Sequence, residues 1–216
     1  MALKGSRLAC VRGGRTLFEG IEVEVGAGEA LWVQGDNGSG KTSLLRLLCG
    51  LSAPTLGTVQ WCGQDLRRLR EDFHRELLYI GHAPGLKDEL TAAENLLLGA
   101  RLAGRRAEAA DAETALDRVG LRRQARLPAG RLSQGQRRRV ALARLHLPRA
   151  PRLLVLDEPF AALDAAASGH LEAVLAHHLA SGGSIVYTTH QTQALRGGRL
   201  QTLRLAAQRA RTALPC

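Results

Sequence analysis

One run of eight residues in this chain has the types and spacing needed to bind a polyphosphate. It fills every fixed position of the pattern GxxxxGK[ST], and its members are Gly35, Asp36, Asn37, Gly38, Ser39, Gly40, Lys41 and Thr42. Glycines let the backbone wrap an anion with its N–H groups. We expect Lys41 to reach the β- and γ-phosphates and the Thr42 hydroxyl to ligate Mg²⁺. The run therefore predicts a nucleoside triphosphate site rather than a Gly-rich surface turn.

The segments on either side of this run have the patterns that such a loop requires. Residues 30–33 (ALWV) are apolar, as a buried strand would be, and residues 43–48 (SLLRLL) have helical apolar spacing. A helix that starts at the loop directs the positive end of its dipole toward the bound anion. The context therefore favours a strand, a phosphate loop and a helix in that order.

A second segment, residues 131–144 (RLSQGQRRRVALAR), offers further donors for an anion. Ser133 is a natural N-cap, so its hydroxyl and the Gly135 backbone would lie at a helix N-terminus. Taken alone, the segment could equally be a capped helix with an arginine-rich solvated face. It resembles the LSGGQ signature of the ATP-binding cassette (ABC) ATPases, with Gln134 in place of the usual Gly. The resemblance implies that Ser133, Gly135 and Gln136 bind nucleotide.

A third segment, residues 153–158 (LLVLDE), is a short apolar run that ends in two carboxylates. A central parallel strand has this pattern, and α/β sheets place their active sites at the carboxyl ends of such strands. We expect Asp157 to hold Mg²⁺ and Glu158 to orient and polarise the attacking water. The alternative is that the two acids only begin a helix. The following PFAALD resembles the ABC segment that leads to the dimer-contacting D-loop.

Two histidines complete the candidate catalytic set. After a predicted helix (165–180) and strand (184–188), His190 follows the strand's carboxyl end. It matches the ABC switch histidine, which by that resemblance contacts the γ-phosphate. His82 stands where most ABC ATPases carry the Q-loop glutamine. It could hydrogen-bond the attacking water or simply pack, and the sequence leaves both roles open.

The composition is that of an ordinary globular domain with an arginine excess. The chain has 216 residues, 45% of them hydrophobic and 23% charged, and a net charge of +10. It lacks an apolar stretch long enough to span a bilayer and an N-terminal secretory pattern, so we expect a soluble intracellular protein. Only Lys4, Lys41 and Lys87 of its 30 basic residues are lysine.

The arginines fall into small clusters, among them residues 137–139. We interpret each cluster as solvated surface, with contact to an anionic membrane as the alternative. Aromatic residues make up only 3% of the chain, which leaves few platforms for stacked bases. We therefore expect no nucleic-acid partner.

The order of predicted elements indicates one α/β domain. Residues 5–33 read as strands with turns, residues 57–63 as a strand and turn, and residues 83–151 as helical. Together with the motifs, this predicts a P-loop NTPase of ABC type with a mixed central sheet, an antiparallel β subdomain and a helical insert. We expect one ATP-binding domain over residues 1–205, with the insert at about 83–151 and a tail at 206–216.

The segment 79–96 (YIGHAPGLKDELTAAENL) narrows the resemblance. It is similar to the Q-loop region of the ATP-binding subunit of the haem exporter of c-type cytochrome maturation. The similarity extends to RTLF at 15–18, TSLLRLLCG at 42–50, RRRVALARL at 137–145 and TTHQ at 188–191. It implies a homodimer that hydrolyses ATP with Mg²⁺ and drives integral membrane permease subunits from the cytoplasmic face of the bacterial inner membrane. We expect no haem to bind this chain directly.

Other functions remain open at this stage. The chain could be the motor of an ABC transporter for another substrate, or an ABC ATPase linked to nucleic acid. A small-molecule kinase would share the phosphate loop but not the Ser133 motif. The aromatic that usually stacks on adenine is missing near Ala9, Cys10 and Val11, and we expect Trp61 to lie in the core or at a subunit contact instead.

Overall fold

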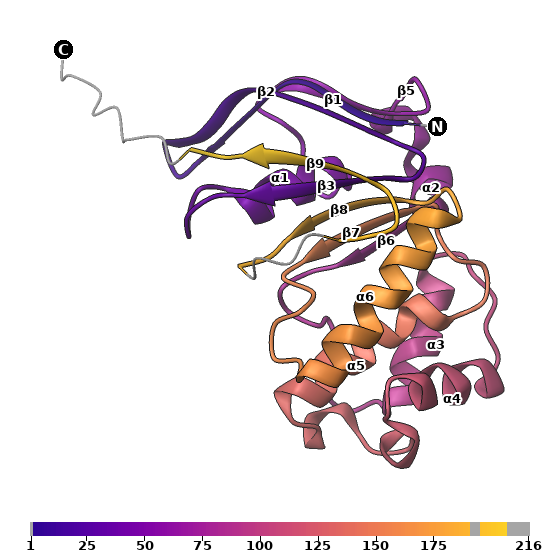
Figure 1. Ribbon diagram of the computed structural model, residues 1–216. Helices are drawn as coiled ribbons and strands as arrows, with labels where there is room; N and C mark the ends of the chain where they lie inside the picture. The colour runs from indigo at the N-terminus through magenta and orange to yellow at the C-terminus, as the bar shows by residue number, and fades with distance from the viewer. Residues whose placement is uncertain (1, 191–194, 207–216) are drawn as a thin grey trace.

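The computed structural model describes residues 2–190 and 195–206. Two β-sheets and a group of helices form successive layers, with the antiparallel sheet at the top of Figure 1, the parallel sheet in the middle and most of the helices below. The phosphate loop and the carboxylates Asp157 and Glu158 lie at the edge of the middle layer, where its strands end.

The N-terminal strands form the antiparallel sheet. Its strand order is β2-β1-β4-β5, with β1 (Ala2–Arg12), β2 (Arg15–Gly26), β4 (Leu56–Trp61) and β5 (Gln64–Asp65). A tight turn at Gly13 and Gly14, both with positive φ, joins β1 to β2. This hairpin brings Leu17 and Phe18 against the phosphate loop, where the Phe18 ring lies 3.0 Å from the position that a Cβ on Gly40 would take.

The second sheet has the order β6-β7-β8-β3-β9. Its strands are β3 (Glu29–Gln34), β6 (Leu77–Ile80), β7 (Leu153–Asp157), β8 (Ser184–Thr188) and β9 (Arg199–Arg204). All of its described pairings are parallel, so the antiparallel strands form a sheet of their own. The predicted fold class is confirmed, with the two strand arrangements divided between two sheets. Every residue of β7 and β8 is buried, as their apolar sequences require.

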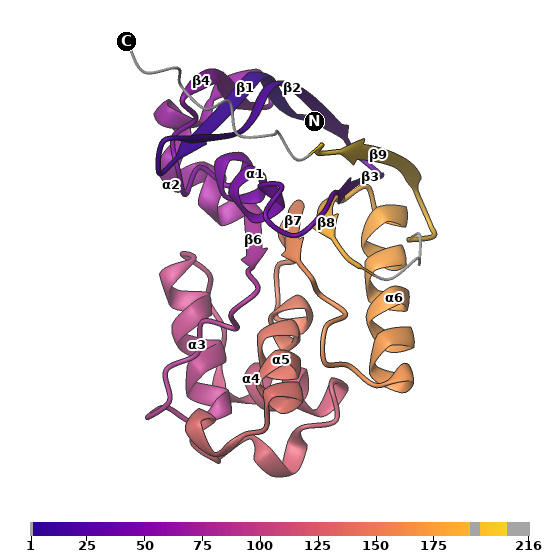
Figure 2. The same ribbon diagram turned by 90° about the vertical axis from the view of Figure 1, so that its left-hand side faces the viewer.

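Helices cover both faces of the parallel sheet. Helix α1 (Lys41–Leu48) lies between the two sheets in Figure 2, where Leu44, Leu45, Leu47 and Leu48 join one core cluster. Helix α6 (Ala165–Ala180) packs on the other face through Leu171, Leu175 and Leu179. Helix α2 (Leu66–Glu76) leads into β6. The phosphate loop is thereby held between a buried strand and a buried helix.

The segment between β6 and β7 forms a helical insert with its own core. It contains α3 (Ala92–Leu102), α4 (Ala109–Arg118), α5 (Gln134–Ala143) and three 3₁₀ turns, η1 (Arg122–Gln124), η2 (Ala129–Arg131) and η3 (Arg144–His146). Small and apolar side chains, including Leu96, Leu116 and Val140, fill the space between these helices. A reciprocal capping box between Thr91 and Glu94 starts α3.

The predicted division of the chain into a domain (1–205) and a tail (206–216) stays a prediction, since residues 207–216 lie outside the described residues. Among the described helices, none combines the length and apolar character needed to cross a membrane.

Candidate functional site

The predicted phosphate loop, carboxylates and histidines meet in one cleft of about 580 Å³. Its walls include Asn37, Gly38, Gly40, Lys41, Thr42, His82, Asp157, Glu158 and His190, together with Leu17, Ser43 and Ala161. These residues come from segments as far apart in the sequence as Leu17 and His190. The parallel sheet brings them together because the loops after β3, β6, β7 and β8 all leave the same edge.

The phosphate loop has a backbone that only glycine fits at two places. Gly35 has φ 150°, and a Cβ there would lie 2.6 Å from the Leu205 carbonyl oxygen and from Ser39 Oγ. Gly40 has φ 97° and lies against the Phe18 ring. Three residues of the loop, Gly35, Asp36 and Ser39, do not line the cleft. Of these, Ser39 is buried.

Lys41 lies across the mouth of this loop. Its Nζ donates hydrogen bonds to the carbonyl oxygens of Gly35 at 2.7 Å and Asp36 at 3.2 Å. The ammonium group therefore sits beside the loop amides, at the first residue of α1. Ammonium, amides and helix N-terminus together make a site for an anion of high charge.

A chain of hydroxyl–carboxylate hydrogen bonds joins three segments next to Lys41. Thr42 Oγ1 donates to Asp157 Oδ2 at 2.7 Å, and Thr188 Oγ1 donates to Asp157 Oδ1 at 2.7 Å. The Asp157 residue is only 2% exposed. The Thr42 hydroxyl and the Asp157 carboxylate are hard oxygen donors within hydrogen-bond distance of each other, a donor set that suits Mg²⁺.

Thr188 is a site residue to which sequence analysis gave no role. It is fully buried, and besides its bond to Asp157 it accepts a hydrogen bond from the Glu158 backbone N–H at 2.9 Å. A signal was present, since a polar residue at the carboxyl end of an apolar strand lies at the edge where α/β sheets bind ligands.

Glu158 combines an unusual backbone with a side chain at the cleft. Its φ of 51° is in the left-handed region, which is unfavourable for a non-glycine residue. Its Oε2 accepts a hydrogen bond from the His190 backbone N–H at 3.2 Å, and its Oε1 lies 3.4 Å from His190 Nε2. The Glu158 side chain is 15% exposed and the His190 side chain 59% exposed. A carboxylate placed in this way can orient a water at the cleft.

His82 also lines the cleft, from the loop after β6. The Asn95 side chain holds this loop, since its Oδ1 accepts from Lys87 N at 2.8 Å and its Nδ2 donates to the Lys87 and Leu90 carbonyl oxygens at 3.0 and 3.1 Å. An ion pair of 2.6 Å between Asp88 and Arg137 also attaches this loop to α5. The Asn95 of the sequence run thus has a structural task, fixing the loop that carries His82.

The signature residues lie outside the cleft. Ser133 and Gln136 form a reciprocal capping box at the start of α5, with bonds of 2.9 and 3.2 Å. A Cβ on Gly135 would lie 3.0 Å from the Ala162 carbonyl oxygen, so α5 approaches the loop after β7 closely there. None of these three residues lines the cleft that holds Lys41. Within this chain, the donors of the signature helix therefore do not border the cleft around that phosphate loop.

The interpretation of the 137–139 arginine cluster as solvated surface is wrong for Arg138. This residue is only 4% exposed, and its guanidinium donates to backbone carbonyls at the cleft edge. The sequence pattern could not separate Arg138 from its two neighbours, because only the packing of α5 on the sheet decides which of the three points inward.

Trp61 lies in the core, as expected. It is 6% exposed and packs against Phe73, with ring centroids 5.8 Å apart. The β1–β2 hairpin supplies Leu17 to the cleft wall.

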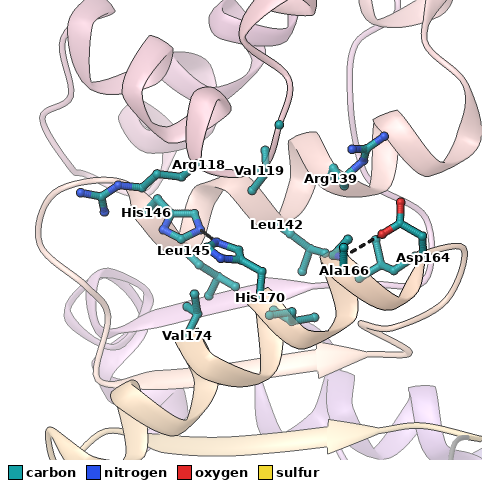
Figure 3. Close-up of a pocket in the computed structure, with 14 residues that line it drawn as sticks. Arg118, Val119, Arg139, Leu142, Leu145, His146, Asp164, Ala166, His170 and Val174 are labelled. Atoms are coloured by element: carbon teal, nitrogen blue, oxygen red, sulfur yellow. Dashed lines mark hydrogen bonds between the residues drawn. The ribbon is translucent and has the colours of Figure 1, made fainter.

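A second cavity of about 330 Å³ lies between α4, α5, η3 and α6 (Figure 3). Leucine side chains form much of its wall, and His146 and His170 meet there with their Nε2 atoms 3.3 Å apart. Burial, His170 and Arg118 together lower the pKa of His146 to about 4. This neutral histidine joins the insert to α6, away from the phosphate loop.

Comparison with known proteins gives a consistent result. Residues 18–161 match the ABC transporter family. The chain is 50% identical over 189 residues to the cytochrome c biogenesis ATP-binding export protein CcmA of Nitrosomonas europaea, covering 88% of each chain. It is 47% identical over 203 residues to the CcmA of Dechloromonas aromatica, covering 94% of this chain and 99% of that one.

Solved structures of ABC cassettes also resemble this chain. A dimeric ATP-binding cassette in a post-hydrolysis state, bound to ADP and Pi, is 25% identical with a TM-score of 0.83, covering 96% of this chain and 97% of that one. The ATP-binding subunit of an ABC transporter is 28% identical with a TM-score of 0.78, covering 88% and 80%.

Proposed function

We propose that this chain is the ATP-hydrolysing subunit of the exporter that serves c-type cytochrome maturation. The chain belongs to the ABC transporter family and, within it, to the CcmA family. Its handling of haem in that process is part of the proposal. The hydrolytic part rests on one observation above all. The phosphate loop, Asp157 and Glu158 share one cleft, with Thr42 and Asp157 in direct contact.

This geometry supports the following roles for the residues. Lys41 and the loop amides bind the phosphates, and Thr42 and Asp157 hold Mg²⁺, which when bound neutralises charge on the phosphates. Glu158 orients the attacking water, because its carboxylate reaches the cleft from a fixed backbone. His190 lies beside this carboxylate and supports the γ-phosphate. His82 is a further polar residue of the cleft wall, with either a catalytic or a packing role.

A second copy of the chain would complete the site. The helix donors at Ser133, Gly135 and Gln136 lie outside the Lys41 cleft of their own chain. The similar solved cassette is a dimer bound to ADP and Pi. Both facts support a two-fold homodimer in which the signature of one chain closes on the phosphate loop of the other.

Membrane subunits are the other proposed partners. The curated relatives are named as ATP-binding export proteins of cytochrome c biogenesis, and export needs a path through the bilayer. This chain would act on integral permease subunits from the cytoplasmic face of the inner membrane. Neither nucleic acid nor direct haem binding by this chain is part of the proposal.

Deletion of the gene in its host tests the proposal. Haem-stained gels should show loss of covalent haem from c-type cytochromes, while b-type cytochromes remain. A wild-type copy should restore the stain, and so should Lys87→Ala, which changes a lysine outside the cleft. Lys41→Ala should not restore it, because productive phosphate binding is lost. Normal c-type cytochromes in the deletion strain would leave only a transporter motor for another substrate.

A further inference from the structure

Strand β6 is an edge strand of the parallel sheet, and arginines of the insert cover its free side. Arg105 Nη2 donates to the Leu77 carbonyl oxygen at 2.9 Å, and Arg144 Nη1 to the Tyr79 carbonyl oxygen at 3.3 Å. Arg138 Nη1 donates to the Gly81 carbonyl oxygen at 2.7 Å. The acceptors are two residues apart, as expected for carbonyls that point to one side of a strand.

These contacts explain why an edge strand can lie under the insert. Backbone carbonyls that are buried need donors, and β6 pairs only with β7 in the described sheet. The guanidinium groups supply the donors that a further strand would have supplied. We call Arg105, Arg144 and Arg138 the edge arginines.

Arg138 differs from the other two edge arginines because it also reaches β7. Its Nη2 donates to the carbonyl oxygens of Asp157 and Glu158, each at 2.7 Å. One buried guanidinium thus joins the end of β6, which leads to His82, with the end of β7, which carries both carboxylates. Its planar fork suits this arrangement, since separate N–H groups can point at separate acceptors.

The contact to Glu158 acts on a strained residue. The left-handed backbone of Glu158 is held by the Thr188 hydroxyl at its N–H, and by the Arg138 guanidinium and the Ala161 N–H at its carbonyl oxygen. A strained backbone persists where its surroundings fix it, and such positions are frequent in active sites. Removing the Arg138 contact would weaken the hold on the backbone that directs the Glu158 carboxylate toward the cleft.

Arg138 also lies on the helix that begins at Ser133. We propose that Arg138 is a positioning residue, which fixes Glu158 and the His82 loop relative to the signature helix of the same chain. The inference rests on the proposed ATP hydrolysis. In a shared-site dimer, Ser133 would contact the partner's nucleotide while Glu158 serves its own, so Arg138 would couple the two sites.

The test compares Arg138→Met with Arg144→Met in the complete complex with its membrane subunits. Both changes remove a guanidinium and its bond to a backbone carbonyl in β6 or directly after it, but only Arg138 also donates to the carbonyl oxygens of Asp157 and Glu158 at the end of β7. ATP affinity, kcat and KM are measured for each, per folded molecule. Arg138→Lys is a second variant, because it keeps a charge but lacks the fork.

We expect Arg138→Met to lower kcat about 10- to 100-fold, as mispositioned catalytic groups do, with ATP affinity within about 2-fold because no phosphate-loop contact changes. Arg138→Lys should fall between Arg138→Met and the wild type. Arg144→Met should keep kcat near the wild-type value. Equal kcat in the two Met variants would overturn the inference, and so would an equal loss of affinity and kcat. An inactive wild-type complex would instead overturn the proposed hydrolysis, and the inference with it.

Discussion

Replacing Thr188 by Val removes one oxygen from the centre of the candidate site. The hydroxyl donates to Asp157 Oδ1 and accepts from the Glu158 N–H. Valine has nearly the same shape and suits a buried strand. The effect of Thr188→Val therefore reports on two hydrogen bonds and not on packing.

The magnitude follows from the two groups left behind. A hydrogen bond to a charged group contributes about 1.5–3 kcal/mol, and a buried N–H left unpaired costs about 1–3 kcal/mol. Because partial relaxation offsets some of this, we expect Thr188→Val to unfold with a free energy about 2–4 kcal/mol lower than the wild type. The matched control, Thr188→Ser, keeps the hydroxyl and loses one buried methyl, at about 1 kcal/mol.

Urea unfolding of the purified chain and steady-state ATP hydrolysis measure the two consequences. The kcat of Thr188→Val should fall about 10-fold because the Glu158 backbone N–H loses its hydrogen bond to the Thr188 hydroxyl, while Thr188→Ser stays near the wild type. If Thr188→Val is as stable as Thr188→Ser and turns over ATP equally fast, the hydroxyl does not organise the two carboxylates and the reasoning fails.

Three further changes test separate parts of the account. Glu158→Gln should lose most ATP turnover yet bind ATP and accumulate as a closed dimer by size-exclusion chromatography; turnover at the wild-type rate would refute its role in orienting water. Gly35→Ala should cost about 1–3 kcal/mol because its Cβ meets the Leu205 carbonyl oxygen. Gly38→Ala should cost less, because Gly38 also has a positive φ of 79° but a Cβ there meets no atom within 4 Å; equal urea midpoints would contradict the loop geometry. Between pH 6.5 and about 4 the unfolded chain gains a proton at His146 that the folded chain lacks, so acid should destabilise the wild type in that window. His146→Asn should flatten this dependence of the urea midpoint on pH, and an unchanged slope would count against the buried neutral histidine.

Elements with a strong local pattern could be predicted from sequence. The helix expected at 165–180 and the strand at 184–188 match α6 and β8 at both ends. Helix α2 and strand β9 were not predicted. In α2, the apolar positions Leu66, Leu69 and Phe73 stand among many arginine and acidic residues, so the apolar pattern of a buried helix is weak in the sequence. Strand β9 (RLQTLR) exists through its pairing with β3, which is distant in the sequence.

The site residues also fall into those that the sequence predicts and those that only the fold shows. Residues that belong to a fixed motif, such as Lys41 and Asp157, could be predicted because spacing alone identifies them. Arg138 could not, because its role depends on where α5 meets the end of β7. For Thr188 only the general signal of a polar residue at the carboxyl end of a strand was present in the sequence, and its bond to Asp157 depends on the pairing of β8 with β7. The acceptors for Arg138 are backbone carbonyls. Every residue has a backbone carbonyl, so the sequence does not indicate which ones accept.

The shared site is tested most directly by a heterodimer of one Lys41→Ala chain and one Ser133→Arg chain, purified through two different tags. Each homodimer should be inactive because both of its sites carry a defect. In the heterodimer, one site should combine the intact phosphate loop of the Ser133→Arg chain with the intact signature of the Lys41→Ala chain. ATP hydrolysis at about half the wild-type rate is then expected, since one of two symmetric sites is intact. A heterodimer no more active than either homodimer would contradict the account.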